Sequence, residues 1–278
     1  MKTPIQRILV PLDPSEYAKA ATLRACQSAQ LHQARVTGLT VLDVPGIRTE
    51  IAPADPVLWE FVEKGIQSGI EDAREKIGKI QGFFSDTCRE FEVEHEDFSI
   101  EGVPSRLLLD ASALHDLVVI GVRTLFHFET RNRPGNSLAK LLGRTATPIL
   151  AVPLSTNESF YKKVVITYDG SMNAARTLRD FASFAAPFDF EITVVSAEDD
   201  SLHGEYLLHD ASSYLHAHGF EQFDTVHVKK RSIPSNLLRD ADLIVAGIHS
   251  KKFFKDQVIG SLTHHLIDRG DTALFLSH

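Results

Sequence analysis

The feature that most constrains this chain is an internal repeat along its 278 residues. Five sequence blocks occur twice and in the same order: 7–15 with 163–171, 20–24 with 175–179, 102–108 with 232–238, 116–121 with 242–247, and 144–150 with 269–275. Chance similarity does not preserve the order of five blocks, so we interpret the chain as one domain written twice. The predicted boundaries are 1–155 for the first copy and 156–278 for the second.

Each copy alternates apolar runs with helical patterns. After each opening run, we expect strands at 36–44, 92–100, 117–120 and 148–152 in the first copy, and at 191–197, 225–230, 243–246 and 273–276 in the second. Continuous apolar runs are typical of strands that are buried on both faces of a parallel sheet. The alternation therefore predicts an α/β fold, with two doubly wound, parallel five-stranded sheets. The second copy is shorter mainly between its second and third strands, where the first copy has a long helix-like stretch from 58 to about 80.

Charge and composition exclude several classes of protein. The formal net charge is -8, and neither copy has the basic excess of a nucleic-acid binder. No apolar run approaches the ~20 residues of a membrane helix, and Met1–Leu9 lacks a signal-peptide pattern, so we expect a cytoplasmic protein with no membrane partner. The 13 histidines and two cysteines show no zinc-ligand spacing, so we assign no metal site. Cys26 is expected to be buried and inert.

The candidate site lies where ligands bind in doubly wound sheets, at the carboxyl ends of the strands where strand order reverses. Each copy places an Asp there, Asp13 or Asp169, and a glycine-containing loop after the fourth strand. In the second copy this loop starts at Gly247 and reaches Gly260 and Ser261, where a helix is expected. Free N–H groups at a helix start, with the helix dipole behind them, favour phosphate. The same residues are also common turn and cap chemistry, so the pattern alone leaves both interpretations open.

Together these residues resemble the universal stress protein family, in tandem form and over nearly the whole chain. ATP-binding members of that family carry an Asp closing strand one and a motif of Gly, two residues, Gly, nine residues, and Gly followed by Ser or Thr. The second copy keeps both spacings but has Ser250 at the second Gly. The resemblance implies an adenine nucleotide alpha-hydrolase-like, Rossmann-like fold. In the second copy it implies nucleotide contacts from Thr167, Asp169, the Ala197 backbone, Gly247, Ser250, Gly260 and Ser261.

The first copy departs further from the family motif. Thr124 replaces the second Gly, and the spacer to Gly135 is one residue longer. The contacts that the resemblance implies there are Pro11, Asp13, Val44, Gly121, Gly135, Asn136 and Ser137. If only one copy binds ATP, we expect it to be the second.

The resemblance also implies an arrangement of the two copies. Single-domain members of the family pair through their last strands. Here Ile149–Val152 and Leu274–Leu276 are expected to pair within one chain as an internal pseudo-dimer, and further association into a homodimer stays open.

Three functions remain open. The first is a cytoplasmic stress-response or regulatory module that binds ATP, with or without Mg, or a related adenine nucleotide, and hydrolyses it slowly at most. The second is an interaction scaffold for a protein partner, which the departures at Ser250, Thr124 and Asn136 favour. The third is an enzyme acting on a nucleotide or a small phosphorylated metabolite. The sequence has no P-loop motif, no nucleophile elbow and no evident general base, so we assign no catalytic residue. The intact segments at 169–171 and 260–261 favour the first function, which is our prediction.

Overall fold

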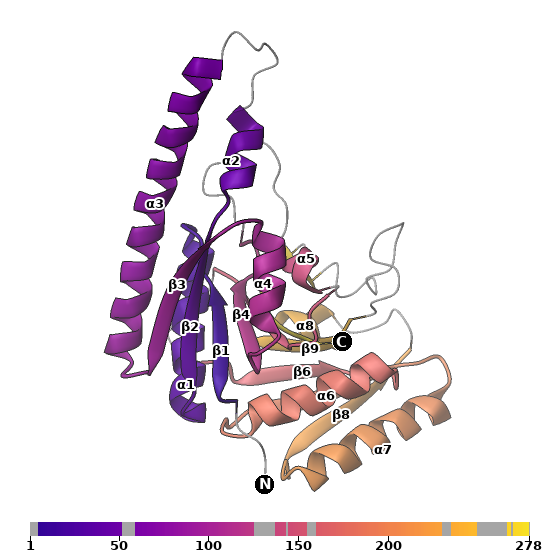
Figure 1. Ribbon diagram of the computed structural model, residues 1–278. Helices are drawn as coiled ribbons and strands as arrows, with labels where there is room; N and C mark the ends of the chain where they lie inside the picture. Colours follow the sequence, from indigo (N-terminus) through magenta and orange to yellow (C-terminus); the bar gives the residue numbers. More distant parts are fainter. Residues whose placement is uncertain are drawn as a thin grey trace. The chain divides into compact units, whose positions relative to one another are not determined.

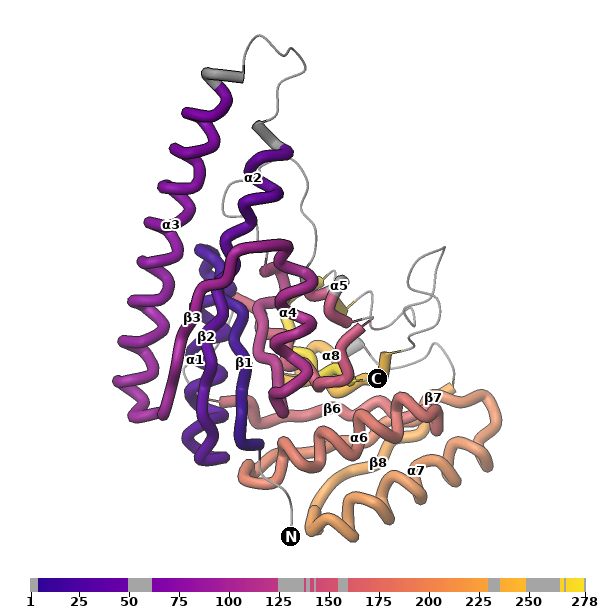
Figure 2. Tube along the Cα trace, viewed as in Figure 1, coloured from indigo at the N-terminus to yellow at the C-terminus, as the bar shows by residue number. Residues whose placement is uncertain are grey.

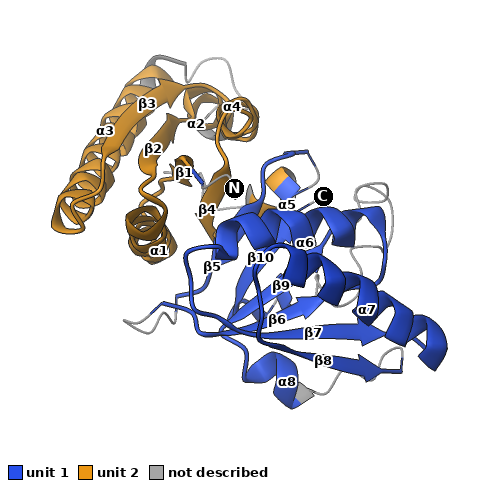
Figure 3. Cartoon of the chain, turned by 90° about the horizontal axis from the view of Figure 1, so that it is seen from below, with its two compact units in different colours: residues 1–5, 142–278 blue, residues 6–141 orange. Residues whose placement is uncertain are grey.

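The computed structural model describes residues 5–51, 59–124, 137–142, 144–154, 160–229, 235–248, 266–267 and 269–277. The chain forms two compact units, residues 6–141 and residues 1–5 with 142–278 (Figure 3). Each unit is described by itself. The fifth strand of the first copy belongs to the second of these units, and the repeat boundary near 155 stays a sequence-based prediction.

The first unit alternates strands and helices from its start (Figure 1). Its elements are β1 (Arg7–Pro11), α1 (Glu16–His32), β2 (Arg35–Leu42), α2 (Val44–Ile51), α3 (Trp59–Glu90), β3 (His95–Glu101), α4 (Pro104–Ser112), β4 (Leu117–Gly121) and α5 (Ser137–Leu142), the last of which runs into the second unit at its end. The strands are parallel in the order β3-β2-β1-β4. Helices α1 and α3 cover one face, and α4 lies on the other (Figure 3). This is the predicted doubly wound layer.

The second unit repeats the pattern. Its elements are β5 (Ile149–Val152), β6 (Lys163–Thr167), α6 (Met172–Ala185), β7 (Glu191–Ala197), α7 (Ser201–Ala217), β8 (Phe223–Val228), α8 (Ser235–Arg239), β9 (Leu243–Gly247) and β10 (Ala273–Ser277). Strands β6 to β10 form a parallel sheet in the order β10-β9-β6-β7-β8. Helices α6 and α7 lie on one face of the sheet and α8 on the other (Figure 3).

Strand β5 extends this second sheet by pairing antiparallel with β10. The register places Leu274 opposite Ala151, and Leu276 opposite Ile149. The predicted pairing between the last strands of the two copies is therefore confirmed.

An Asp fixes the start of the first strand in each copy. Asp116 accepts hydrogen bonds from the backbone N–H groups of Gln6 and Arg7, both at 2.9 Å. Asp242 accepts the equivalent bonds from Lys162 and Lys163, at 2.9 and 2.8 Å. These contacts explain why both copies carry an Asp just before the fourth strand.

The first unit differs from the second between its second and third strands, where α2 and the 32-residue α3 lie side by side (Figures 1 and 2) and the second unit has only the 17-residue α7 among its described residues. The facing side chains of α2 and α3 form one apolar cluster with the end of β2: Leu42, Val44, Ile47, Val62, Ile66, Ile70, Ala73 and Ile77. The sequence predicted the helix but ended it near Ile80, ten residues early. It ends instead at Glu90, and Glu92 then takes a left-handed backbone with φ 54°. The third strand accordingly begins at His95 rather than Glu92.

Both cysteines lie between α1 and α3 and are fully buried, as expected for Cys26. Their sulfur atoms are 3.5 Å apart, a contact that the sequence did not predict. The hydrogen bond to Cys88, together with burial, holds the pKa of the Cys26 thiol far above its usual range. A thiol that stays protonated is a poor nucleophile, so this pair is packing in the described state.

Candidate functional site

Strand order reverses between β6 and β9 in the second unit and between β1 and β4 in the first. The carboxyl ends of these strands are where a doubly wound sheet opens to a ligand. Thr167 ends β6 and Gly247 ends β9, and the two strands are hydrogen-bonded neighbours. The structure therefore brings these two predicted residues to one edge, with Asp169 two residues beyond Thr167.

An Asp, one residue and a Ser form the same turn in both copies. One Asp169 oxygen accepts from the Ser171 N–H at 3.0 Å, and the Ser171 hydroxyl accepts from the Ala174 N–H at 3.1 Å. Asp13 and Ser15 repeat this geometry at the start of α1. Ser15 and Ser171 are thus N-caps.

The glycine that ends the fourth strand of each copy lets the first helix approach closely. A Cβ on Gly247 would lie 2.7 Å from the backbone nitrogen of Ala174 on α6. A Cβ on Gly121 would lie 2.4 Å from the Cβ of Tyr17 on α1. These contacts give both glycines a packing role, whether or not a phosphate lies nearby.

In the second unit, the described residues of the predicted site can be reached from solvent. Asp169 is exposed, while Thr167, Ala197 and Gly247 are half-buried. The Thr167 hydroxyl donates to the carbonyl of Val245 at 3.1 Å, which holds its side chain against β9. The main chain at Ala197 ends β7, beside β6 in the sheet.

In the first unit, the corresponding residues are covered. Asp13 is 1% exposed, and Pro11 and Gly121 are also buried. Val44, predicted at the end of the second strand, is instead the first residue of α2, because β2 ends at Leu42 and Asp43 accepts from the Gly46 N–H at 2.9 Å to start the helix. Its side chain belongs to the apolar cluster between α2 and α3. The Val44 side chain is therefore part of the hydrophobic core, and its predicted backbone contact with adenine stays a prediction.

Several predicted residues lie outside the described part of the chain. They are Ser250, Gly260 and Ser261 in the second copy and Gly135 and Asn136 in the first. Ser137 begins α5, and only its backbone is described. The predicted contribution of these residues to a phosphate loop stays a prediction.

Two tyrosines and an Asp that sequence reasoning missed interact beside Asp169, through Tyr168. Burial, followed by the carboxylates of Asp210 and Asp169 and the nearby Tyr206, raises the pKa of Tyr168. A hydrogen bond to Asp210 raises the pKa of Tyr206, which lies on the surface. Both phenols therefore stay protonated at neutral pH. The signal available in the sequence was the position of Tyr168, directly between Thr167 and Asp169.

The amino-acid sequence matches the model of a known protein family. The model of the universal stress protein family matches residues 4–153, more than half of the chain. The chain belongs to the universal stress protein family. No curated protein is similar enough to count as a match.

Solved universal stress proteins share the fold. The match to one from Archaeoglobus fulgidus DSM 4304 covers 98% of this chain and 97% of that protein's chain, with a TM-score of 0.72 at 15% sequence identity. A putative universal stress protein from Pseudomonas aeruginosa UCBPP-PA14 covers 98% of this chain and 93% of its own, with a TM-score of 0.57 at 14% identity. A universal stress protein solved in complex with cAMP covers 55% of this chain and 100% of its own, with a TM-score of 0.38 at 20% identity. The first two likenesses extend over both copies, so the tandem arrangement fits the family.

No group of three or more His, Cys, Asp or Glu side chains is placed to hold a metal ion in the part of the chain that the structure describes. Within the same residues, no helix has the length and apolarity needed to cross a membrane.

Proposed function

We propose that this universal stress protein is a cytoplasmic regulatory module that binds ATP or a related adenine nucleotide in its second copy. The observation that carries the proposal is the difference in access between equivalent residues. Asp169 is exposed at the strand-order switch point of the second unit, whereas Asp13 is 1% exposed in the first. A ligand needs an accessible edge, and only the second copy offers one among its described residues.

The residues at this edge fit the nucleoside end of such a ligand. The Asp169 carboxylate can accept hydrogen bonds from ribose hydroxyls, and main-chain groups at Ala197 can bond the adenine edge. The turn after β7 adds Glu198, Asp199 and Asp200, so this part of the edge is acidic. Carboxylates suit hydroxyl and amine donors and repel phosphates, which the proposal assigns to the loop at 247–261. There Gly260 and Ser261 would hold the phosphates.

The decisive experiment releases bound ligand by denaturing the purified protein and separates it by chromatography. We expect about one adenine nucleotide per chain, because one of the two copies is accessible. Asp169→Asn should weaken nucleotide binding at least about tenfold, since a hydrogen bond to a charged group is lost. Asp13→Asn is the matched control. The folded variant should bind the nucleotide with the affinity of the folded wild type.

Three outcomes would contradict the proposal. Nucleotide loss from Asp13→Asn alone would place the ligand in the first copy. Unchanged affinity in a folded Gly260→Val variant would remove the phosphate-loop assignment. No released nucleotide, together with no heat on adding ATP, would leave the scaffold function in its place.

One observation favours the scaffold as a second candidate. Large apolar side chains are exposed near the starts of α6 and α7: Met172 at 72%, Leu202 at 77% and Tyr206 at 59%. These helix starts lie at the same edge as Asp169, and exposed apolar groups of this kind mark protein contacts when they form one patch. A Leu202→Ser/Met172→Ser variant that loses a co-purifying protein while keeping nucleotide would assign this surface to a partner.

A further inference from the structure

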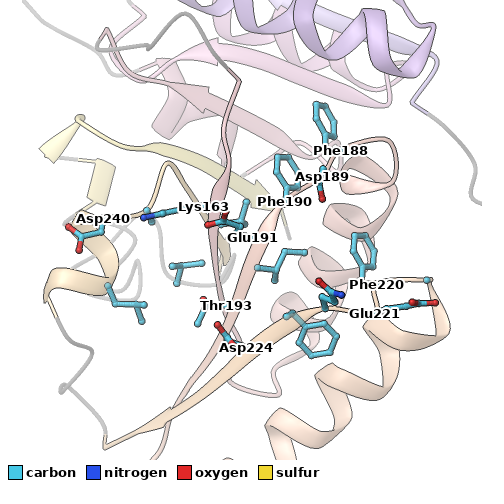
Figure 4. A pocket seen from close by; sticks show the side chains of 18 of the residues that line it. Lys163, Phe188, Asp189, Phe190, Glu191, Thr193, Phe220, Glu221, Asp224 and Asp240 are labelled. Carbon is cyan, nitrogen blue, oxygen red and sulfur yellow. The ribbon is translucent and has the colours of Figure 1, made fainter.

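A hollow of about 810 Å³ opens in the second unit at the edge where strands begin (Figure 4). Lys163, Glu191 and Phe223, the first residues of β6, β7 and β8, line it. The proposed nucleotide contacts end the strands of this sheet, so the hollow lies at the opposite edge. Its volume is within the ~300–1,000 Å³ of small-molecule sites.

The hollow exists because the sheet face behind it is thinly covered. Helix α8 has five residues, whereas α4 covers the equivalent face of the first unit with nine. Val165 and Thr193 face one another in the β6–β7 register and reach the hollow directly. A longer helix in place of α8 would fill this space.

Aromatic rings form part of the lining. Phe188 and Phe190 stack with ring centroids 4.9 Å apart and planes 9° apart, and Phe160 stacks on Phe188 with ring centroids 4.6 Å apart. Phe220, just before β8, and Phe223, its first residue, also line the hollow. All four lining phenylalanines are half-buried rather than sealed in the core. Accessible apolar surface gathered in one concave place is typical of a binding site.

Carboxylates are spread around the same hollow. They come from the α6–β7, α7–β8 and α8–β9 connections and from the starts of β7 and β8: Asp189, Glu191, Glu221, Asp224 and Asp240. Lys162 pairs with Glu191 at 2.9 Å, and Arg239 lies 3.6 Å from Asp240. Glu221 and Asp224 are exposed and form no ion pair with any described residue. Lys163 is the basic side chain among the lining residues, so the lining is strongly acidic.

We propose that this hollow binds a linear aliphatic polyamine, a chain of methylene groups that carries several ammonium groups. The carboxylates stand on three sides, so they match charges that are spaced along a chain. A compact metal ion would need its ligands gathered at one point, and the described residues contain no such group. The phenylalanine faces suit the rest of the ligand, because rings attract ammonium groups and pack against methylene stems.

The test is a calorimetric titration of the full chain with spermine, at low and moderate salt. Glu221→Gln/Asp224→Asn removes two exposed carboxylates from the hollow and should weaken spermine binding about tenfold. The matched control is Glu71→Gln/Asp72→Asn, two exposed carboxylates on α3 in the first unit. It removes the same charge from the chain and should leave affinity unchanged. Phe220→Ala, checked for an unchanged unfolding midpoint, should weaken binding at both salt concentrations.

Each contrary result overturns a stated part of the proposal. No heat with spermine removes the site, and equal weakening by both double variants reduces the effect to general charge attraction. Unchanged affinity in folded Phe220→Ala excludes the rings. Tighter binding of a lysine-rich peptide than of spermine, lost in Glu221→Gln/Asp224→Asn, replaces the polyamine with a protein segment. Nucleotide release measured on the same variants should match wild type, so failure of this site and failure of the nucleotide site are distinguishable.

Discussion

The two copies share a turn and a strand order but differ in what lies over the same edge. In the first unit, Val44 enters an apolar cluster with α2 and α3, and Asp13 is 1% exposed. In the second unit, β7 is followed by a three-residue turn and α7, and Asp169 is exposed. The comparison teaches that the same motif residue can stand in two environments. In the first copy, the Asp is buried and holds its turn, and the longer connection after the second strand adds an apolar cluster.

The largest effect is expected from the glycines that end β4 and β9. Gly247→Val should lower the free energy of unfolding by about 4 kcal/mol, because the new Cβ would meet backbone atoms of α6 that cannot rotate away. Gly121→Val should cost a similar amount against α1. Urea unfolding measures both. Gly78→Ala, where a Cβ meets nothing within 4 Å, is the control and should stabilise the chain slightly. A marked difference between the Gly121 and Gly247 variants would break the structural equivalence of the copies.

The apolar cluster in the first unit should come next. Ile66 is 3% exposed, and Ile66→Ala should destabilise the chain by about 3 kcal/mol through lost burial and a cavity. The nucleotide content of the folded variant should not change, because this cluster lies in the first copy and the proposed site lies in the second. A gain of a second nucleotide per chain would show that the covered edge had kept its binding capacity.

The paired aspartates should then differ in stability. Asp13→Asn should cost about 2 kcal/mol, because a buried carboxylate that accepts from the Ser15 N–H and hydroxyl becomes an amide with fewer acceptors. Asp169→Asn should cost about 0.5 kcal/mol, since the same turn is exposed there. Thermal unfolding of the two variants compares them directly. Equal costs would mean that burial of Asp13 does not distinguish the copies.

The smallest effect is a pH dependence confined to the first unit. Burial lowers the pKa of His115 below 6.5, while its Nδ1 lies 2.7 Å from the Ala111 carbonyl. The unfolded chain then binds the proton more readily than the folded chain. The contribution of neutral His115 to the free energy of unfolding is complete above pH 6.5 and declines as the pH falls below that value. The repeat places Ala241 at the equivalent position in the second copy. His115→Ala should therefore reduce the loss of stability between about pH 7.5 and about pH 5.5, measured by urea unfolding; an unaltered pH profile would contradict this.

The sequence was a good guide where the pattern is local. Repeated blocks and apolar runs predicted the parallel strands, and the family resemblance implied the pairing of the terminal strands. The prediction ended α3 near Ile80 because its final turns, 81–90, contain polar residues. The sequence has no strong stop signal before Glu92, and the helix continues to Glu90. Val44 was assigned to the strand because its β-branched side chain continues an apolar run, and only packing on α3 shows that it is helical. The Cys26–Cys88 contact, and the hollow at the edge where the strands of the second unit begin, depend on tertiary distances that no spacing in the sequence encodes.

The pairing of β5 with β10 has a consequence for how these copies behave in solution. Strands that belong to separate chains join in a second-order process and come apart on dilution, whereas these two strands are held on one chain at a high effective concentration. Their association is then first-order and independent of protein abundance. The chain can be scarce and still keep this seam closed, and neither copy can exchange its partner for that of another molecule without breaking the sheet.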